Sequence, residues 1–349
     1  MIRTEEISGF LNLKAEMPLI DVRSPGEYAI GHIPGAVNIP LFSDEERAKV
    51  GTLYKQSGKE AALFLGLDFV GPKMSGFIKK LKSLIRGKTN KAALYCWRGG
   101  MRSSSMAWLF STAGFDATLL QGGYKAYRTY IRQQSGSGAP IFVLGGMTGS
   151  GKTEVLHQLQ KMGQQVIDLE NLAHNKGSVF GYLGQPPQPT NEQFENLLFE
   201  EWSKIDPSKP VWLEDESRSI GAVGQPPVFF DRMKLSPLIL LRVPSEIRVK
   251  RLLEEYTGFD KMLLQEALEK ISRPLGGEGI AEARKEIQEG DFAPAIRLVL
   301  KYYDKTYEKA LQKFNQREIT ELHSETGDAV ANANMILSHL RNRDRKSVV

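Results

Sequence analysis

The sequence predicts an α/β protein in two parts, each built on a parallel sheet. Short apolar segments of strand length alternate along the chain with segments whose apolar residues recur at helical spacing. This alternation is typical of parallel sheets covered by helices, with ligand sites at the carboxyl ends of strands. A Gly- and Ser-rich segment separates the parts. We therefore expect one domain over residues 1–132, a linker over 133–139, and a second domain over 140–349 with a helical C-terminal region.

Composition places the chain among ordinary globular proteins. Its 349 residues are 41% hydrophobic and 25% charged, with a formal net charge of +5. The mild positive charge permits a polyanionic partner. We expect no membrane-spanning segment and no signal peptide. A single cysteine fits a reducing cytosol, so we expect a cytoplasmic protein.

The first elements are short. Residues 19–23 predict a strand, and the Gly- and Pro-rich residues 31–40 predict a loop leading into a second short strand. Residues 43–67 predict a helix, and residues 72–88 carry apolar residues at helical spacing. The other face of that second segment is basic and includes Lys79, Lys80 and Lys82. Such a face is either merely solvated or contacts a phosphate backbone.

The only cysteine of the chain lies on a loop between a predicted strand, residues 91–95, and a predicted helix, residues 103–110. The loop consists of Cys96, Trp97, Arg98, Gly99, Gly100, Met101 and Arg102. A helix N-terminus and nearby arginines favour a thiolate. The glycines let successive N–H groups point into one concavity that binds an anion. We predict that Cys96 is catalytic and that Trp97 to Arg102 bind an anion; the alternative is a buried structural cysteine.

This half resembles the rhodanese domain over residues 1–132. The resemblance rests on the motifs at 20–28 (IDVRSPGEY), 31–38 (GHIPGAVN) and 122–127 (GGYKAY), together with the cysteine loop. It implies that Cys96 carries a chalcogen as a persulfide-type adduct.

The cysteine loop departs from the common rhodanese pattern. Five residues separate Cys96 from Arg102, one more than usual. A wider loop suits a tetrahedral, phosphate-like anion. The spacing also occurs in Cys-dependent phosphatases of related fold, which usually have His before the cysteine where this chain has Tyr95.

The second half begins with a phosphate-binding motif. Residues 140–145 predict a strand that runs into G-x-x-x-x-G-K-T, the P-loop pattern. Its members are Gly146, Met147, Thr148, Gly149, Ser150, Gly151, Lys152 and Thr153. Backbone N–H groups at the start of the following helix would cradle phosphates, Lys152 would neutralise terminal oxygens, and Thr153 could hold Mg²⁺. We expect no tightly bound cofactor, although Mg²⁺ is possible.

Two further segments of this half carry candidate site residues. The long loop at 175–189 contains Phe180 and Tyr182, which could stack on a base or pack on an apolar ligand. A predicted strand at 210–213 ends in acidic residues, where P-loop proteins hold a metal ion. We favour Asp215 over Glu214 for this role. Arg218 could meet a phosphate or form a salt bridge.

The remaining elements complete the α/β pattern. Strands are predicted at 165–168, 238–242 and 319–322. Helices are predicted at 245–256, 260–272, 279–288, 294–314 and 329–340.

A rhodanese-like half followed by a P-loop half resembles the tRNA 2-selenouridine synthase family. Beyond the two motifs, the resemblance rests on residues 175–181, 187–189 and 214–221. It implies a transferase that converts wobble 2-thiouridine of tRNA to 2-selenouridine. Selenophosphate would be the donor, and geranyl diphosphate would first form an S-geranyl intermediate. Lys79, Lys80, Lys82, Phe180 and Tyr182 would then be possible contacts to tRNA or to the prenyl group.

Other functions remain open at this point. One is a sulfurtransferase, acting on tRNA or a small molecule, coupled to a nucleotide-hydrolysing P-loop domain. Others are a Cys-dependent phosphatase and a tRNA-binding module with a relic P-loop. The sequence leaves open which tRNAs bind, whether nucleotide is hydrolysed, and the oligomeric state.

Overall fold

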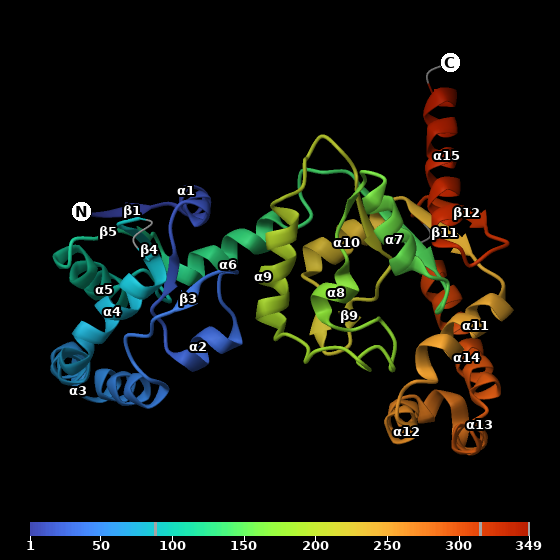
Figure 1. Cartoon of the computed structure of the whole chain (residues 1–349), viewed down its shortest axis with the longest axis horizontal. Helices are drawn as coiled ribbons and strands as arrows, with labels where there is room; N and C mark the ends of the chain where they lie inside the picture. The colour runs from blue at the N-terminus through green and yellow to red at the C-terminus, as the bar shows by residue number, and fades with distance from the viewer. Residues whose placement is uncertain (87–88, 314–315, 348–349) are drawn as a thin grey trace. The chain divides into compact units, whose positions relative to one another are not determined.

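The computed structural model describes residues 1–86, 89–313 and 316–347 (Figure 1). It divides into two compact units, Met1–Gln134 with Glu195–Phe199, and Ser135–Phe194 with Glu200–Val349. The division falls inside the predicted linker. Gln133 and Gln134, however, are the last residues of helix α6 (Gly123–Gln134).

The first unit contains a parallel sheet, as expected. Its strands are β1 (Ile2–Glu5), β2 (Leu19–Asp21), β3 (Val37–Asn38), β4 (Lys91–Tyr95) and β5 (Asp116–Leu120). They lie in the order β1-β5-β4-β2-β3, and each neighbouring pair is parallel. The sequence did not predict β1, because Ile-Arg-Thr-Glu lacks an apolar pattern. It is an edge strand whose pairing with β5 starts at Ile2 and Ala117.

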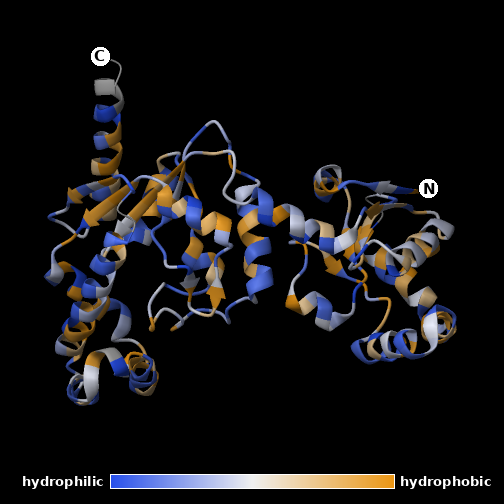
Figure 2. Cartoon of the chain, turned by 180° about the vertical axis from the view of Figure 1, so that it is seen from behind, coloured by the Kyte–Doolittle hydropathy of each residue, from blue (hydrophilic) through white to orange (hydrophobic). Residues whose placement is uncertain are grey.

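Helices cover both faces of this sheet. They are α1 (Ile7–Asn12), α2 (Pro25–Ile30), α3 (Asp44–Val70), α4 (Met74–Ile85), α5 (Met101–Thr112) and α6. The side chains of β4 alternate: Leu94 packs with α4 and α5, whereas Tyr95 packs with α1 and α6. Figure 2 shows the strands as predominantly hydrophobic, as expected for a sheet buried on both faces. The predicted helical residue Lys88 lies outside the described residues.

One stretch of this unit bears on the expectation about membrane spans. Asp44–Ile85 is long and apolar enough to cross a membrane by length and composition, which is weak evidence. The stretch is interrupted, because Gly58 has a non-helical φ of 87° and Gly71–Lys73 form a 3-10 turn. Helix α4 also buries Phe77, Leu81 and Ile85 in the core of the unit.

The second unit has its own parallel sheet. Its strands are β6 (Ile141–Gly146), β7 (Gln165–Val166), β8 (Val211–Glu214), β11 (Leu238–Arg242) and β12 (Ile319–His323), in the order β12-β11-β6-β8-β7. Helices α7 (Lys152–Lys161) and α15 (Ala329–Ser347) pack on one face, where Leu156 and Ile336 join Leu144 and Ile239. Strands β9 (Ser219–Ile220) and β10 (Val223–Gly224) form a separate antiparallel pair. The P-loop therefore follows a central strand, β6.

A group of helices forms a second core beside this sheet (Figure 1). The other helices of the unit are α8 (Leu169–Ala173), α10 (Pro227–Leu235), α11 (Ser245–Tyr256), α12 (Lys261–Glu269), α13 (Ser272–Glu289) and α14 (Phe292–Gln312). Helix α9 (Asn191–Trp202) is shared, because its residues Glu195–Phe199 belong to the first unit. Helices α12, α13 and α14 bury apolar side chains against one another and against Phe180. Helix α13 begins earlier than predicted and is kinked at Gly276. The predicted end of α14 at Phe314 lies outside the described residues.

Candidate functional site

The backbone of the cysteine loop is fixed by the start of α6. The carbonyl of Cys96 accepts the Tyr124 N–H at 2.8 Å, and the carbonyl of Trp97 accepts the Lys125 N–H at 2.9 Å. Gly99 and Gly123 have φ of 67° and 61°. A Cβ on Gly123 would lie 2.4 Å from the Cys96 carbonyl oxygen, which no side chain tolerates. The loop can therefore close against α6 only because these positions are glycine.

The Cys96 thiol lies at the start of α5. The Cys96 residue is 3% exposed, so it is buried. The Ser103 hydroxyl is 3.2 Å from Sγ and 3.1 Å from the Gly100 carbonyl oxygen. A hydroxyl at this place can donate to sulfur and fix the direction of the thiol. The sequence analysis did not single out Ser103, although it follows Arg102 directly.

The two arginines of the loop have different surroundings. Arg98 is exposed. Arg102 forms a two-point ion pair with Glu27 of α2, with N–O distances of 2.5 and 3.3 Å. Glu27 also accepts the Ser24 N–H at 3.1 Å, as part of the cap of α2. The role of Arg102 in anion binding stays a prediction, and a bound anion would compete with Glu27 for it.

The P-loop connects β6 to α7. Gly149 and Gly151 both have φ of 78°, and Lys152 Nζ donates to the Gly146 carbonyl at 3.1 Å. Two residues distant in sequence hold this loop from outside. Arg248 donates to the Thr148 carbonyl at 3.2 Å, and the Tyr307 hydroxyl accepts the Gly146 N–H at 3.2 Å. Neither contact has a local sequence signal.

The acidic partner of the P-loop is Glu214, not Asp215. Thr153 Oγ1 lies 2.9 Å from Glu214 Oε1 and 2.9 Å from Glu170 Oε2. Our preference for Asp215 was wrong, because consecutive side chains at a strand end point to opposite sides. Asp215 also lines the P-loop cleft, but it binds three other groups: Lys234 Nζ at 2.8 Å, Arg317 Nη1 at 2.7 Å and the Tyr307 hydroxyl at 2.8 Å.

Burial sets the protonation of these carboxyl groups. Burial, followed by the charge of Glu216, raises the pKa of Glu170 to about 8. Burial and the neighbouring Glu170 also raise the pKa of Glu214 well above its ordinary value. Asp215 differs: burial opposes its ionisation, but the charges of Lys234 and Arg317 outweigh burial and lower its pKa. Glu170 and Glu214, the two carboxyl groups at Thr153, therefore favour the protonated form, whereas Asp215 is ionised and has a structural role.

A cleft of about 900 Å³ surrounds the P-loop. Its walls carry three cationic side chains, Lys152, Lys176 and Arg251, together with seven acidic ones. Lys176 is paired with Glu255 and Arg251 with Glu154, so a ligand with several negative charges would have to take these cations from their carboxylate partners. Arg218 is exposed and is not among the lining residues.

The residues at the P-loop fit Mg²⁺ only together with a phosphate ligand. The described part of the chain contains no group of three or more His, Cys, Asp or Glu residues that could hold a metal ion. Mg²⁺ commonly takes one or two carboxylates plus substrate phosphates. The Thr153 hydroxyl and the Glu214 carboxyl group would fit that arrangement if Mg²⁺ displaced the proton that burial favours on Glu214. Asp215, which binds Lys234 and Arg317 instead, does not fit it.

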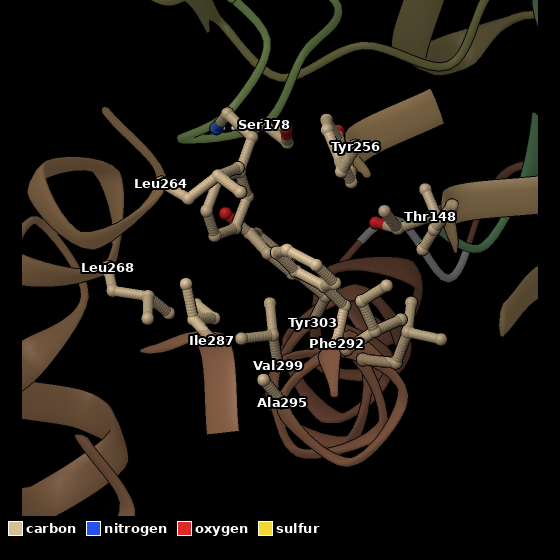
Figure 3. A pocket seen from close by; sticks show the side chains of 14 residues that line it. Thr148, Ser178, Tyr256, Leu264, Leu268, Ile287, Phe292, Ala295, Val299 and Tyr303 are labelled. Carbon is tan, nitrogen blue, oxygen red and sulfur yellow. Dashed lines mark hydrogen bonds between the residues drawn. The ribbon is translucent and has the colours of Figure 1, made fainter. Parts of the chain in front are cut away.

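An apolar pocket lies beside the same loop (Figure 3). Thr148 of the P-loop and Phe180 line it, together with side chains of α11, α12, α13 and α14. Tyr182 does not line the pocket; its ring lies 4.0 Å from Lys270 Nζ. Helices α11 to α14 supply most of the pocket wall. The sequence predicted these helices but not their packing beside the P-loop.

The fold and sites define a class of protein with a rhodanese-like cysteine-loop unit followed by a P-loop α/β unit. Residues 5–130 match the rhodanese-like domain, and residues 139–335 match the tRNA 2-selenouridine synthase AAA domain. The chain belongs to the tRNA 2-selenouridine synthase family, which is a family of enzymes.

Curated relatives with the name tRNA 2-selenouridine synthase match most of the chain. The protein of Nitrosomonas europaea is 34% identical over 90% of this chain and 94% of its own length. The protein of Bordetella petrii is 37% identical over 86% of this chain and 89% of its own length. That of Bdellovibrio bacteriovorus is 43% identical over 69% of this chain, and the match spans 64% of that relative, just under two thirds.

The raised pKa of Glu170 predicts a pH-dependent stability. Its pKa rises from 4.5 to about 8 on folding, so the folded state holds a proton that the unfolded state releases. The free energy of unfolding should therefore fall by about 4 kcal/mol as pH rises from about 4.5 to about 8. Glu170→Gln should flatten this slope, as measured by calorimetric melting between pH 5 and pH 9. Glu278→Gln, at an exposed position of α13, is the control and should keep the slope. A slope that Glu170→Gln leaves intact would contradict the assignment.

Proposed function

We propose that this chain converts wobble 2-thiouridine of tRNA to 2-selenouridine in the cytoplasm. Selenophosphate is the donor, and geranyl diphosphate supplies an S-geranyl intermediate. The observation that carries the proposal is the presence of two separate anion-binding loops in one chain of this family, one of which has a cysteine at its start. The name of the curated relatives supports the tRNA product. The two loops correspond to two anionic substrates.

The first half-reaction uses the P-loop. The thiocarbonyl sulfur of the base attacks C1 of geranyl diphosphate, the C–O bond breaks, and its electron pair leaves with diphosphate. The base then loses its N3 proton. Lys152, Lys176 and Arg251 line the cleft that would hold the diphosphate. Mg²⁺ bound through Thr153 and Glu214 would supply further charge neutralisation.

The second half-reaction uses Cys96, and electron balance restricts its role. Selenium in selenophosphate is already fully reduced, so a perselenide on Cys96 would need an oxidant that neither substrate provides. Attack of the Cys96 sulfur on phosphorus needs none. An S–P bond forms, the P–Se bond breaks, and the electron pair leaves with selenium. Selenide then displaces geranylthiol from C2 of the base, and water releases phosphate from Cys96. The phosphate-sized spacing from Cys96 to Arg102 supports this assignment.

Complementation in cells tests the function as a whole. Cells lacking this protein should contain no 2-selenouridine at the wobble position, and the intact gene should restore it. Cys96→Ser should lower the 2-selenouridine content by at least about 100-fold, because serine is a weaker nucleophile than cysteine. S-geranyl-2-thiouridine should still form in this variant. The measurement is mass spectrometry of wobble nucleosides. Normal selenation by Cys96→Ser would contradict the role of the cysteine.

Lys152→Ala should block the first half-reaction selectively. Loss of the P-loop lysine should reduce S-geranyl tRNA formation by about 100-fold or more, because the diphosphate leaving group loses its nearest cation. Supplied S-geranyl tRNA should still be converted at a near-normal rate. Product analysis of each half-reaction, with and without ATP, measures both. Geranylation that strictly requires ATP hydrolysis would instead favour the nucleotide-dependent sulfurtransferase.

The exposed basic face of α4 is a candidate tRNA contact. Lys79, Lys80 and Lys82 are all exposed. Binding through phosphates releases counterions, so charge reversal of the three lysines should weaken tRNA binding by about tenfold or more and flatten its salt dependence. Filter binding at several salt concentrations measures both effects. An unchanged affinity and salt slope would mean that this face is merely solvated.

A further inference from the structure

The apolar pocket adjoins the P-loop cleft. Five residues line both, namely Thr148, Ser178, Leu252, Tyr256 and Tyr303. Figure 3 shows Thr148 and Tyr256 on one side of the pocket, and Leu268 and Ile287 on the opposite side. A ligand with its phosphates in the P-loop therefore has this pocket as its apolar neighbour.

The pocket is narrow. The space around it amounts to about 500 Å³ with open solvent included, but only about 40 Å³ of this admits the centre of a water-sized sphere. So narrow a pocket has no room for a purine ring system, and a hydrocarbon chain enters it only when the lining side chains move apart. Side chains such as Leu264 and Leu268 can adjust their rotamers around a chain that enters.

The pocket offers little to a polar ligand. Its far wall is aliphatic and aromatic, and its hydroxyl groups lie at the mouth. The Tyr303 hydroxyl already accepts the Val179 N–H at 3.0 Å. Burial raises the pKa of Tyr303 to about 12 and raises that of Tyr256 as well, so both stay neutral. A nucleobase in this pocket would leave its hydrogen-bonding groups without partners, which is costly.

Helix α14 joins the pocket wall to the P-loop. Its first half lines the pocket through Ala295 and Val299. One turn further on, Asp304 binds Arg248 through N–O distances of 2.9 and 2.7 Å, and Arg248 holds the Thr148 carbonyl. Tyr307 of the same helix accepts the Gly146 N–H. A chain that packs on α14 therefore contacts the helix that sets the shape of the diphosphate loop.

We propose that the pocket between α11 and α14 binds the hydrocarbon chain of the prenyl diphosphate, and that its far end, at Leu268 and Ile287, selects chain length. This inference rests on the proposed function. It names the residues that would decide which prenyl chain is accepted by the site whose P-loop holds the diphosphate.

Filling the pocket tests the assignment in the full-length protein. Ala295 is 4% exposed and lines the pocket, so Ala295→Phe should weaken geranyl diphosphate binding by about tenfold or more. Binding of inorganic diphosphate should stay within about twofold, because the P-loop is unchanged. Ala281→Phe, at an exposed position of α13, is the matched control and should alter neither affinity. Calorimetric titration measures both ligands.

Enlarging the far end provides a second test that does not depend on the bulky variant folding. Ile287→Ala should shift the ratio of farnesyl to geranyl transfer upward by about tenfold, because the additional isoprene unit gains space. Equal geranyl affinity in wild type and Ala295→Phe, or an unchanged transfer ratio in Ile287→Ala, would overturn the pocket assignment.

The outcomes separate this inference from the proposed function. If wild type makes S-geranyl tRNA but the variants behave like wild type, the pocket assignment is wrong and the function stands. If wild type makes no S-geranyl tRNA and binds geranyl diphosphate no more tightly than inorganic diphosphate, both are wrong. Tight, pocket-dependent geranyl diphosphate binding without transfer to tRNA would support the pocket and overturn the function.

Discussion

The cysteine loop and the P-loop both depend on close backbone approaches at glycines. At Gly123 a side chain would lie 2.4 Å from the Cys96 carbonyl oxygen, and at Gly149 it would lie 3.2 Å from the Arg248 carbonyl oxygen. Both glycines also have positive φ. Each loop follows a central parallel strand, β4 or β6, where the backbone leaves the sheet and its N–H groups become available. The geometry of both sites thus follows from the sheet and a few glycines.

Charge pairing decides which polar residues remain available for chemistry. Asp215 is neutralised by Lys234 and Arg317 and supports Tyr307, so it belongs to the framework behind the P-loop. Arg102 is paired with Glu27, and an anion that recruits Arg102 must replace a two-point ion pair. Thr153, in contrast, faces carboxyl groups whose protonation can change near neutral pH. The same residue types therefore have different roles according to their partners.

The sequence predicted what local patterns encode. Strand β11 and helix α11 have the predicted bounds, and the P-loop motif lies between a strand and a helix as expected. Strand β1 was missed because it is polar and depends on pairing with β5. The choice between Glu214 and Asp215 depends on which side of the sheet each side chain faces, and the bond from Arg102 to Glu27 spans 75 positions. Such contacts are decided by tertiary packing and leave no local signal.

Helix α14 shows why the P-loop and the helical region belong together. A P-loop recognises phosphate through N–H groups and one lysine, and it carries no information about the group attached to the phosphate. Specificity for that group must come from a neighbouring surface, here the pocket walls of α11 to α14. Because Asp304, through Arg248, and Tyr307 tie α14 to the loop, a change in the position of that wall is transmitted to Thr148 and Gly146. On the proposed assignment, recognition of the apolar chain and recognition of its diphosphate would be coupled through this helix.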